Sequence, residues 1–303
     1  MIDIAGLRHA VPYLRMFQGK TFVLKAGGEA FAEDGQARRL LEQVEVLFRL
    51  GIRVVLVHGG GTQSTELARA LGAEPRMVAG RRVTDERALA VAAMVLNGAV
   101  NTRLLALCRS LDLPAVGLSG VDAGLVRARR RPPAAVGSEI VDFGLVGDVA
   151  AVEPRVLTTL LAAGMLPVVS PLSAADDGTL LNINADTVAA ALAVALEAEK
   201  LILLTGAPGI LERLDDASSL VSYTDLAGLA ELKRRGALSG GMLPKAEALE
   251  AALRGGVKRA HVVSCSSPDS LLVEVFTNEG CGTMVVASTG SAPVPHLVAT
   301  EGA

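Results

Sequence analysis

The chain has 303 residues, half of them apolar, and a formal net charge of -3. This charge excludes the basic surface that nucleic-acid binding requires. The three cysteines, Cys108, Cys265 and Cys281, share no spacing typical of a metal site, and their odd number argues against a disulfide framework. The N-terminus lacks a signal-peptide pattern, and no uninterrupted apolar run reaches the roughly 18 residues of a membrane helix, so we expect a cytoplasmic protein without membrane contact.

Residues 3–18 place apolar side chains at helical spacing, with Pro12 in the middle, where it should start or kink a helix. The segment precedes the first strand, so the main domain does not obviously need it. The pattern predicts either a packed N-terminal arm or a partner-binding helix. The apolar stripe consists of Ile4, Leu7, Val11, Leu14 and Phe17.

From residue 21 onward, predicted strands and helices alternate, which indicates a mostly parallel sheet with helices on both faces. A hairpin of Val126–Arg130 and Val146–Val152 interrupts the alternation, and a proline-rich tail over residues 288–303 is expected to be disordered. The strands are expected at Thr21–Leu24, Val54–Val57, Pro114–Leu118, Leu166–Ser170, Leu201–Thr205, Ala260–Val263 and Thr283–Val286. The helices are expected at Gln36–Leu50, Thr62–Leu71, Glu86–Arg109, Pro154–Ala163, 187–198, Thr224–Arg235 and Lys245–Arg254.

Two glycine turns follow the first two strands and precede helices: Lys25-Ala26-Gly27-Gly28 and His58-Gly59-Gly60-Gly61. Strand, glycine turn and helix together direct backbone N–H groups at an anion. Two such turns, the first with a lysine, suggest two anions held head to head, as phosphoryl transfer to a carboxylate requires. The alternatives are a surface lysine at a strand end and a plain tight turn. The first turn is not a P-loop, whose lysine follows its second glycine, and His58 is expected to be a packing residue.

Two further stretches place cations beside predicted helix starts. Arg81 and Arg82 precede the helix expected from Glu86, and a guanidinium can bind a carboxylate through two hydrogen bonds; the sequence does not tell which of the two faces solvent. Lys245 follows Gly240-Gly241-Met242-Leu243-Pro244, in the first turn of a predicted helix, where a cation opposes the helix dipole. This unfavourable placement favours a functional reason for Lys245.

Asn182, Asn184 and Asp186 lie two residues apart at the start of another predicted helix. Asp186 is either the residue that caps this helix or a carboxylate that orients two cationic side chains, while Asn182 hydrogen-bonds a substrate. Both interpretations can hold together.

Seven stretches, in this order along the chain, resemble the amino acid kinase family and, within it, the branch that phosphorylates N-acetyl-L-glutamate. They are Lys25–Gly28, Val57–Gly61, Gly80–Asp85, Asn182–Asp186, Lys200–Gly209, Gly240–Lys245 and Leu272–Met284. The resemblance implies an α/β fold with an open, mainly parallel eight-stranded sheet between helices. It also implies an N-lobe over residues 20–175 that binds the acyl amino acid and a C-lobe over 176–287 that binds ATP. The implied reaction is ATP-dependent phosphorylation of the γ-carboxylate, the second step of arginine biosynthesis, with Mg²⁺ bridging the ATP phosphates.

The resemblance also implies a role for each matching residue. Lys25 and Lys245 stabilise the transferring phosphoryl group from opposite sides, and Asp186 holds both lysines. A carboxylate is already nucleophilic at neutral pH, so neither a general base nor a protein-bound metal is implied. The acceptor is bound by Gly59 and Gly60 at its γ-carboxylate and by Arg82 and Asn182 at its other end. The nucleotide is bound by Gly27, Gly28, Thr205, Gly209, Gly241 and Met242.

The segment 1–19 resembles the N-terminal helix of the arginine-inhibited members of the family. There such helices join dimers into a hexamer, a trimer of dimers. The resemblance then implies an L-arginine site near this helix, with Glu274, Gly280 and Gly282 as candidate residues. The chain departs from the family at Gly206, where an aspartate is usual, and at Ser264–Asp269, which borders that site.

Two other functions fit the same pattern. One is a kinase of another N-acylated acidic amino acid, such as succinylglutamate or a carrier-linked aminoadipate, because the acyl pocket is not readable from sequence. The other is a non-catalytic arginine-sensing module. The presence of Lys25, Asp186 and Lys245 together, and no acetyltransferase domain expected after residue 288, argue against the module.

Overall fold

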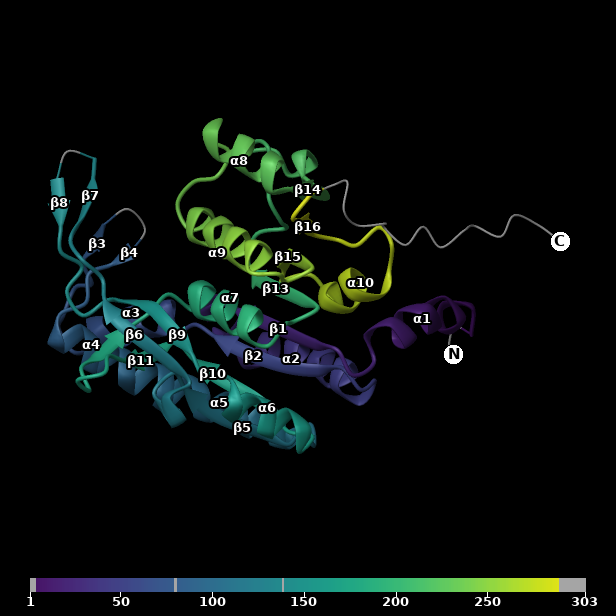
Figure 1. The fold of residues 1–303 in the computed structure, drawn as a ribbon, viewed down its shortest axis with the longest axis horizontal. Helices are drawn as coiled ribbons and strands as arrows, with labels where there is room; N and C mark the ends of the chain where they lie inside the picture. Colours follow the sequence, from purple (N-terminus) through teal and green to yellow (C-terminus); the bar gives the residue numbers. More distant parts are fainter. Residues whose placement is uncertain (1–3, 79–80, 138, 289–303) are drawn as a thin grey trace.

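The computed structural model describes residues 4–78, 81–137 and 139–288. An eight-stranded sheet runs through the molecule (Figure 1), and all neighbouring strands pair in parallel except β15 and β16. The expected strands are all present, and β14 was not expected. In spatial order they are β14 (Tyr223–Asp225), β16 (Thr283–Val286), β15 (Arg259–Ser264), β13 (Lys200–Thr205), β1 (Thr21–Ala26), β2 (Arg53–His58), β10 (Leu166–Ser170) and β5 (Ala115–Ser119).

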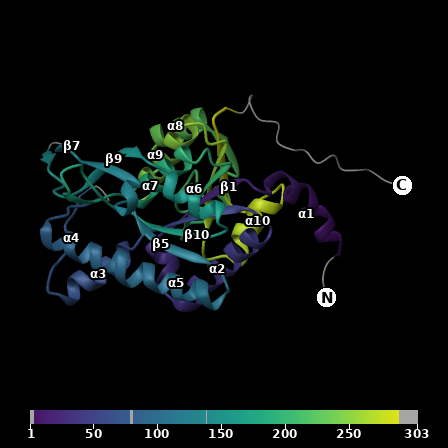
Figure 2. The same ribbon diagram turned by 60° about the horizontal axis from the view of Figure 1, so that its bottom comes forward.

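Helices cover both faces of this sheet, as the alternating pattern predicted (Figure 2). Successive side chains of a strand point to opposite faces, so Val23 lies in one apolar layer and Leu24 in the other. The first layer includes α6 (Arg155–Ala162), α7 (Ala185–Ala195), α8 (Leu226–Arg234) and α9 (Met242–Arg254). The second includes α2 (Asp34–Arg49), α3 (Gly61–Ala70), α4 (Glu86–Ala93), α5 (Asn101–Ser110) and α10 (Ser270–Phe276).

A smaller sheet and two hairpins lie beside the main sheet. The expected hairpin is present as the antiparallel pair β6 (Val126–Arg130) and β9 (Gly147–Val152), joined by β11 (Leu172–Ala174) and β12 (Leu180–Asn182). Two short hairpins that the sequence did not predict lie at one end of the molecule in both views (Figures 1 and 2). They are β3 (Met77–Val78) with β4 (Arg81–Arg82), and β7 (Ala134–Val136) with β8 (Glu139–Val141).

One helical run extends over Glu86–Ser110, close to the single helix that was expected. Its middle turn, η2 (Met94–Val100), is a π-helix between α4 and α5. By length and composition alone this run could cross a membrane, although it holds no uninterrupted apolar stretch of about 18 residues. Its inward side chains, among them Val95, Leu104 and Cys108, pack in the second apolar layer, as those of a core helix do.

The N-terminal helix α1 (Ile4–Phe17) runs through Pro12 and extends away from the body of the molecule in both views (Figures 1 and 2). Its buried side chains are Tyr13 and Phe17, whereas Val11 is 37% exposed. Within this one chain Val11 is thus uncovered, and its burial against the same helix of a neighbouring subunit stays a prediction. The side chains of Ile4 and Leu7 lie outside the described part of the chain, and so does the tail after residue 288.

The main sheet is continuous across the expected boundary between the lobes at residues 175 and 176. β1 lies at its centre and pairs in parallel with β2 on one side and β13 on the other. The division into an acyl-binding lobe and an ATP-binding lobe thus remains a prediction about function. Three 3₁₀ helices complete the described part of the chain: η1 (Gly28–Phe31), η3 (Asp122–Gly124) and η4 (Ala217–Ser219).

Candidate active site

The two glycine turns meet at the carboxyl ends of β1 and β2. The Gly59 N–H donates to the carbonyl oxygen of Ala26 at 2.8 Å. A Cβ on Gly28 would lie 3.2 Å from the Gly61 nitrogen, and a Cβ on Gly60 would lie 2.9 Å from a methyl group of Leu96. Side chains are thus excluded where the turns approach each other. A cavity of about 260 Å³ opens beside them, and its lining includes Lys25 and Asp186 as well as the glycines.

Two lysines bind the same carboxylate at this cavity. The Lys25 Nζ lies 2.8 Å from Asp186 Oδ1, and the Lys245 Nζ lies 3.5 Å from Asp186 Oδ2. Lys25 is only 5% exposed and Asp186 only 4%. The three residues come from β1, α7 and α9, so the fold brings together side chains that are far apart in sequence. A buried triad with one excess positive charge favours an anion in the adjacent cavity.

The cap of helix α7 is Asn184 and not Asp186. The Asn184 Oδ1 accepts from the N–H groups of Asp186 at 2.8 Å and Thr187 at 3.3 Å. Of the two interpretations of Asp186, the helix-cap reading is therefore wrong. Asp186 lies two residues further along, within the first turn, and its carboxylate is directed at the two lysines.

The glycine N–H groups differ in availability. The Gly59 N–H already donates to the Ala26 carbonyl, so the predicted hydrogen bond to the acceptor carboxylate falls to the Gly60 N–H. Within the described ranges, no hydrogen bond involves the N–H of Gly60 or Gly61. Gly61 begins α3, so these two donors also lie at the positive end of a helix dipole.

Arg82 and Asn182 lie at the other end of this cavity and also line a neighbouring groove of about 600 Å³. The Arg82 Nη2 donates to Thr65 Oγ1 at 2.7 Å and to the Gly61 carbonyl at 3.1 Å. The Asn182 Nδ2 donates to Thr84 Oγ1 at 3.4 Å. The two polar side chains thus face the same space from β4 and β12.

Sequence reasoning missed Arg131, which lines the same groove. Its guanidinium pairs with Asp148 at 2.6 Å, and the side chain is only 14% exposed. In the sequence, Arg131 and the two prolines after it fit the connection that follows the expected strand Val126–Arg130. β6 ends at Arg130 and buries Val126 and Ala128, so the strand alternation gives no signal for Arg131.

The residues expected to bind the nucleotide lie in three places. Gly27 and Gly28 line the cavity that holds Lys25. Thr205 ends β13, which pairs with β1. Gly241 precedes α9 and its carbonyl accepts from the Lys245 Nζ at 3.5 Å, while Met242 is the first residue of that helix. Gly209 has a packing explanation, because a Cβ there would lie 2.6 Å from Leu220 and 2.7 Å from Thr283 Oγ1.

The departure from the family at Gly206 coincides with an unusual neighbour. A Cβ on Gly206 would lie 4.0 Å from the Cγ of Glu29, whose carboxylate lies over Gly27. This carboxylate has no hydrogen bond or ion pair with any described residue and lines the Lys25 cavity. Glu29 thus places an acidic group close to where the usual aspartate would stand.

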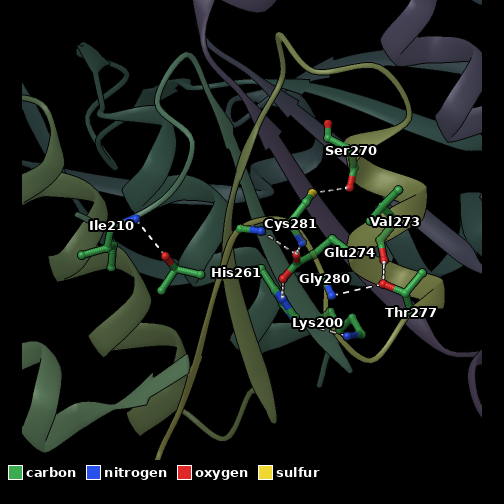
Figure 3. Close-up of polar contacts among 11 residues, drawn as sticks. Lys200, Ile210, His261, Ser270, Val273, Glu274, Thr277, Gly280 and Cys281 are labelled. Atoms are coloured by element: carbon green, nitrogen blue, oxygen red, sulfur yellow. Dashed lines mark hydrogen bonds and ion pairs between the residues drawn. The ribbon is translucent and has the colours of Figure 1, made fainter. Parts of the chain in front are cut away.

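A second polar cluster surrounds Glu274 on the far side of β15 (Figure 3). Glu274 Oε1 lies 2.7 Å from His261 Nδ1, and its Oε2 accepts from the N–H groups of Cys281 and Gly282 at 2.8 and 2.9 Å. Burial alone would raise the pKa of Glu274, but these hydrogen bonds outweigh it and lower the pKa to about 2. His261 Nε2 lies 3.1 Å from the Nζ of Lys200.

This cluster borders a cavity of about 240 Å³ whose wall includes helix α1. Tyr13 and Phe17 line it, and the Tyr13 hydroxyl donates to Asn278 Oδ1 at 2.5 Å. The Lys200 Nζ lies 5.1 Å from the centre of the Phe17 ring, and burial lowers the pKa of Lys200 to about 8. The predicted Gly280 has a positive φ of 61° beside Glu274.

Comparison with known proteins gives a consistent picture. A model described as the amino acid kinase family matches residues 20–264. The chain is 49% identical over 295 residues to the acetylglutamate kinase of Myxococcus xanthus, covering 95% of this chain and 96% of that protein. It is 46% identical over 283 residues to the acetylglutamate kinase of Symbiobacterium thermophilum, covering 93% and 97%.

Among solved structures, the N-acetylglutamate synthase of Neisseria gonorrhoeae, complexed with coenzyme A and N-acetyl-glutamate, superposes with a TM-score of 0.83 at 30% identity. The match covers 95% of this chain and 64% of the synthase chain, so the chain spans slightly less than two thirds of that protein. The same synthase complexed with coenzyme A and L-arginine gives a TM-score of 0.82.

Proposed function

The chain belongs to the amino acid kinase family, and from this premise we propose that the cleft around Asp186 transfers the γ-phosphoryl group of ATP to the γ-carboxylate of N-acetyl-L-glutamate. The protein is an acetylglutamate kinase and acts in arginine biosynthesis, in the cytoplasm. The observation that carries the proposal is the buried arrangement of Lys25 and Lys245 about one carboxylate, beside free N–H groups.

The mechanism depends on placement and charge. The acceptor carboxylate is ionised at neutral pH and attacks without a base. Negative charge then spreads over the transferring group, where Lys25 and Lys245 neutralise it from two sides. Asp186 keeps both ammonium groups in place, and the Gly60 N–H offers a hydrogen bond to the acceptor end.

Magnesium is inferred to enter with ATP. Among the described residues, no three metal-binding side chains gather into a site, so the phosphate oxygens would supply most ligands. The unpaired carboxylate of Glu29 at the mouth of the cavity fits a further contact to the ion or to its water shell. When bound, the ion reduces the negative charge of the phosphates.

The function is tested by trapping the acyl phosphate with hydroxylamine in the presence of ATP. N-acetylglutamate, succinylglutamate and acylated aminoadipates are compared at equal concentration. We expect the highest kcat/KM for N-acetylglutamate. A preference for another acceptor would identify a different kinase of this family, and no product with any acceptor would identify a non-catalytic module.

Arg82→Ala should raise the KM for acetylglutamate and leave ATP binding unchanged, because Arg82 faces the non-reacting end of the acceptor. Loss of a hydrogen bond to a charged group costs about 1.5–3 kcal/mol, or roughly 10- to 100-fold in KM. Kinetics with each substrate varied, together with ATP calorimetry, measures this. The control is Arg127→Ala, an exposed arginine of β6 paired with Asp176 at 3.9 Å. Loss of ATP binding in Arg82→Ala would contradict the assignment. Arg81→Ala is expected to be the milder change.

We also propose that the cavity between α1 and Glu274 binds L-arginine as an inhibitor. Two cationic side chains, Lys200 and Arg259, line this cavity together with the Glu274 carboxylate. The cations suit the carboxylate end of a ligand, and Glu274 suits its guanidinium end. Tyr13 and Phe17 of α1 line the cavity, so a bound ligand can displace α1. Such a displacement would alter the contact of α1 with a neighbouring subunit. Inhibition requires that arginine binds one arrangement of the lobes more tightly than another.

Deleting residues 1–18 should convert a hexamer to dimers and abolish arginine inhibition without loss of catalysis, because the deletion removes Tyr13 and Phe17 from the cavity wall. Light scattering and an arginine titration of activity measure both effects. As a control, Tyr13→Phe removes only the hydroxyl bonded to Asn278 and should keep the hexamer. A truncated hexamer would refute the assembly role, and a full-length enzyme indifferent to millimolar arginine would refute the feedback.

A further inference from the structure

A buried histidine and asparagine lie directly beneath the second glycine turn. His58 ends β2 and is fully buried, and Asn101 begins α5 and is 5% exposed. The Asn101 Nδ2 lies 3.0 Å from His58 Nε2 and 3.1 Å from the carbonyl oxygen of Val168 on β10. The other ring nitrogen, His58 Nδ1, lies 3.1 Å from the carbonyl oxygen of Gly59. The mechanism described above uses neither side chain.

These contacts determine which nitrogen of His58 carries the proton. A carbonyl oxygen only accepts hydrogen bonds, so the Asn101 atom that faces Val168 has to be its NH₂ group. The second hydrogen of that group points at His58 Nε2, which therefore accepts. The proton of the neutral ring lies on Nδ1, which donates to the Gly59 carbonyl. Burial lowers the pKa of His58 to about 4, so the ring is neutral near pH 7.

The Gly59 carbonyl shares its peptide group with the Gly60 N–H. In a trans peptide the C=O and N–H point in opposite directions, and the chain contains no cis peptide bond in its described part. A hydrogen bond that holds the carbonyl towards His58 therefore directs the Gly60 N–H away from it. Gly60 lines the cavity of Lys25 and Asp186, and its N–H makes no bond to another described residue.

The π-helical turn η2 contributes to the same support. Three of its side chains, Val95, Leu96 and Val100, approach the position that a Cβ on Gly60 would take, at 3.4, 2.9 and 3.7 Å. Asn101 follows directly and is accommodated because Gly117 on β5 has no side chain there. π-turns occur often at functional sites. Here the turn packs three apolar side chains against Gly60 and brings the Asn101 amide to His58, next to the Gly59–Gly60 peptide group.

We propose that His58 and Asn101 are positioning residues that fix the Gly59–Gly60 peptide, so that the Gly60 N–H is held ready for the charge that develops on the acceptor carboxylate. This inference rests on the proposed function for the identity of the acceptor. The orientation of the peptide itself does not depend on that identity, and the tests below separate the two.

The first test observes the ring nitrogens in the unaltered protein. The chain has four histidines, and a nitrogen-15 long-range correlation spectrum distinguishes the protonated nitrogen of each neutral ring. We expect a resonance pair for His58, assigned by its loss in a His58 variant, with the proton on Nδ1 at pH 7. A proton on Nε2 would overturn the proposal, whatever the activity of the enzyme.

The second test compares two substitutions of one residue. In His58→Asn the side-chain amide stands where Nδ1 was and keeps a donor for the Gly59 carbonyl. In His58→Gln the amide reaches the place of Nε2, which keeps a partner for Asn101 but removes that donor. We expect His58→Gln to lose at least 10-fold in kcat with little change in the KM for acetylglutamate, and His58→Asn to stay within about 3-fold of the unaltered enzyme.

A control separates positioning from general destabilisation. Gln43→Leu removes another buried hydrogen bond, from the Leu271 N–H to Gln43 Oε1 at 3.0 Å, in the same apolar layer but far along the chain from the turn. It should lower thermal stability and leave kcat unchanged. Binding of ADP with aluminium fluoride and acetylglutamate, which mimics the transferring phosphoryl group, should weaken in His58→Gln in proportion to kcat. Equal kcat for the two His58 variants, or unchanged binding of the mimic, would overturn the proposal.

Discussion

Lys25→Ala and Lys245→Ala should each lower kcat by about 10²- to 10³-fold, on the order of 2–4 kcal/mol of transition-state stabilisation. Each ammonium group faces a position where negative charge grows during transfer, and water in its place would have to reorient. The two lysines approach Asp186 from different elements, β1 and α9, so neither can replace the other. Steady-state turnover at saturating ATP and acetylglutamate measures the loss.

Lys233→Ala is the matched control, because Lys233 is exposed on α8 and should have normal turnover. Lys25→Ala should also remain folded, since Asp186 keeps Lys245 as a partner. Turnover within about 3-fold of the unaltered enzyme in either cleft variant would refute the assignment of that lysine.

Asp186→Ala should reduce both stability and turnover. Removing one partner of a buried ion pair leaves an uncompensated charge, at a cost of about 3–5 kcal/mol. Here the carboxylate is 4% exposed and two ammonium groups depend on it. Urea unfolding, followed by circular dichroism at pH 7, measures the change in the free energy of unfolding.

A double variant separates charge burial from loss of packing. Lys25→Met combined with Asp186→Leu removes both charges of the shorter ion pair and restores apolar volume, so it should recover part of the stability and none of the activity. The recovery should be incomplete, because Lys245 still lacks its carboxylate partner. If Asp186→Ala lowered the free energy of unfolding by less than about 1 kcal/mol, water or another group would be neutralising the charge of the lysines. Asp186 would then not be the residue that holds them.

The sequence was informative about the centre of the fold, for a physical reason. β1 and β2 are buried after their first residues, so they read as apolar runs, and parallel neighbours end at the same edge of a sheet. The meeting of the two glycine turns follows from that geometry. The short elements β14 and α10 were not predictable, because their three and seven residues are too few to show a periodic pattern. The residue before α10, Asp269, also has a positive φ of 54°, which is unusual for a helix cap.

Side-chain contacts were less predictable than the fold. The sequence suggested Asp186 as a possible cap, but Asn184 has the extended backbone of the cap position and accepts from the N–H groups of Asp186 and Thr187. The commitment of the Gly59 N–H to Ala26 depends on the spacing of two strands and has no local signal. On α1 the apolar spacing indicated Phe17 but not Tyr13, and both side chains pack in the second apolar layer.

The continuous ladder between β1 and β13 has a mechanical consequence. Five residue pairs, from Phe22 with Lys200 to Ala26 with Leu204, join the two lobes through backbone hydrogen bonds. A motion between the predicted lobes would have to proceed through a change in sheet twist, because a hydrogen-bonded ladder cannot act as a flexible hinge. Such a motion leaves the central strand almost still and displaces the outer helices most. We then expect Lys25, on the central strand, to move least, and Lys245, carried by α9, to be the lysine whose distance from Asp186 grows first when products leave.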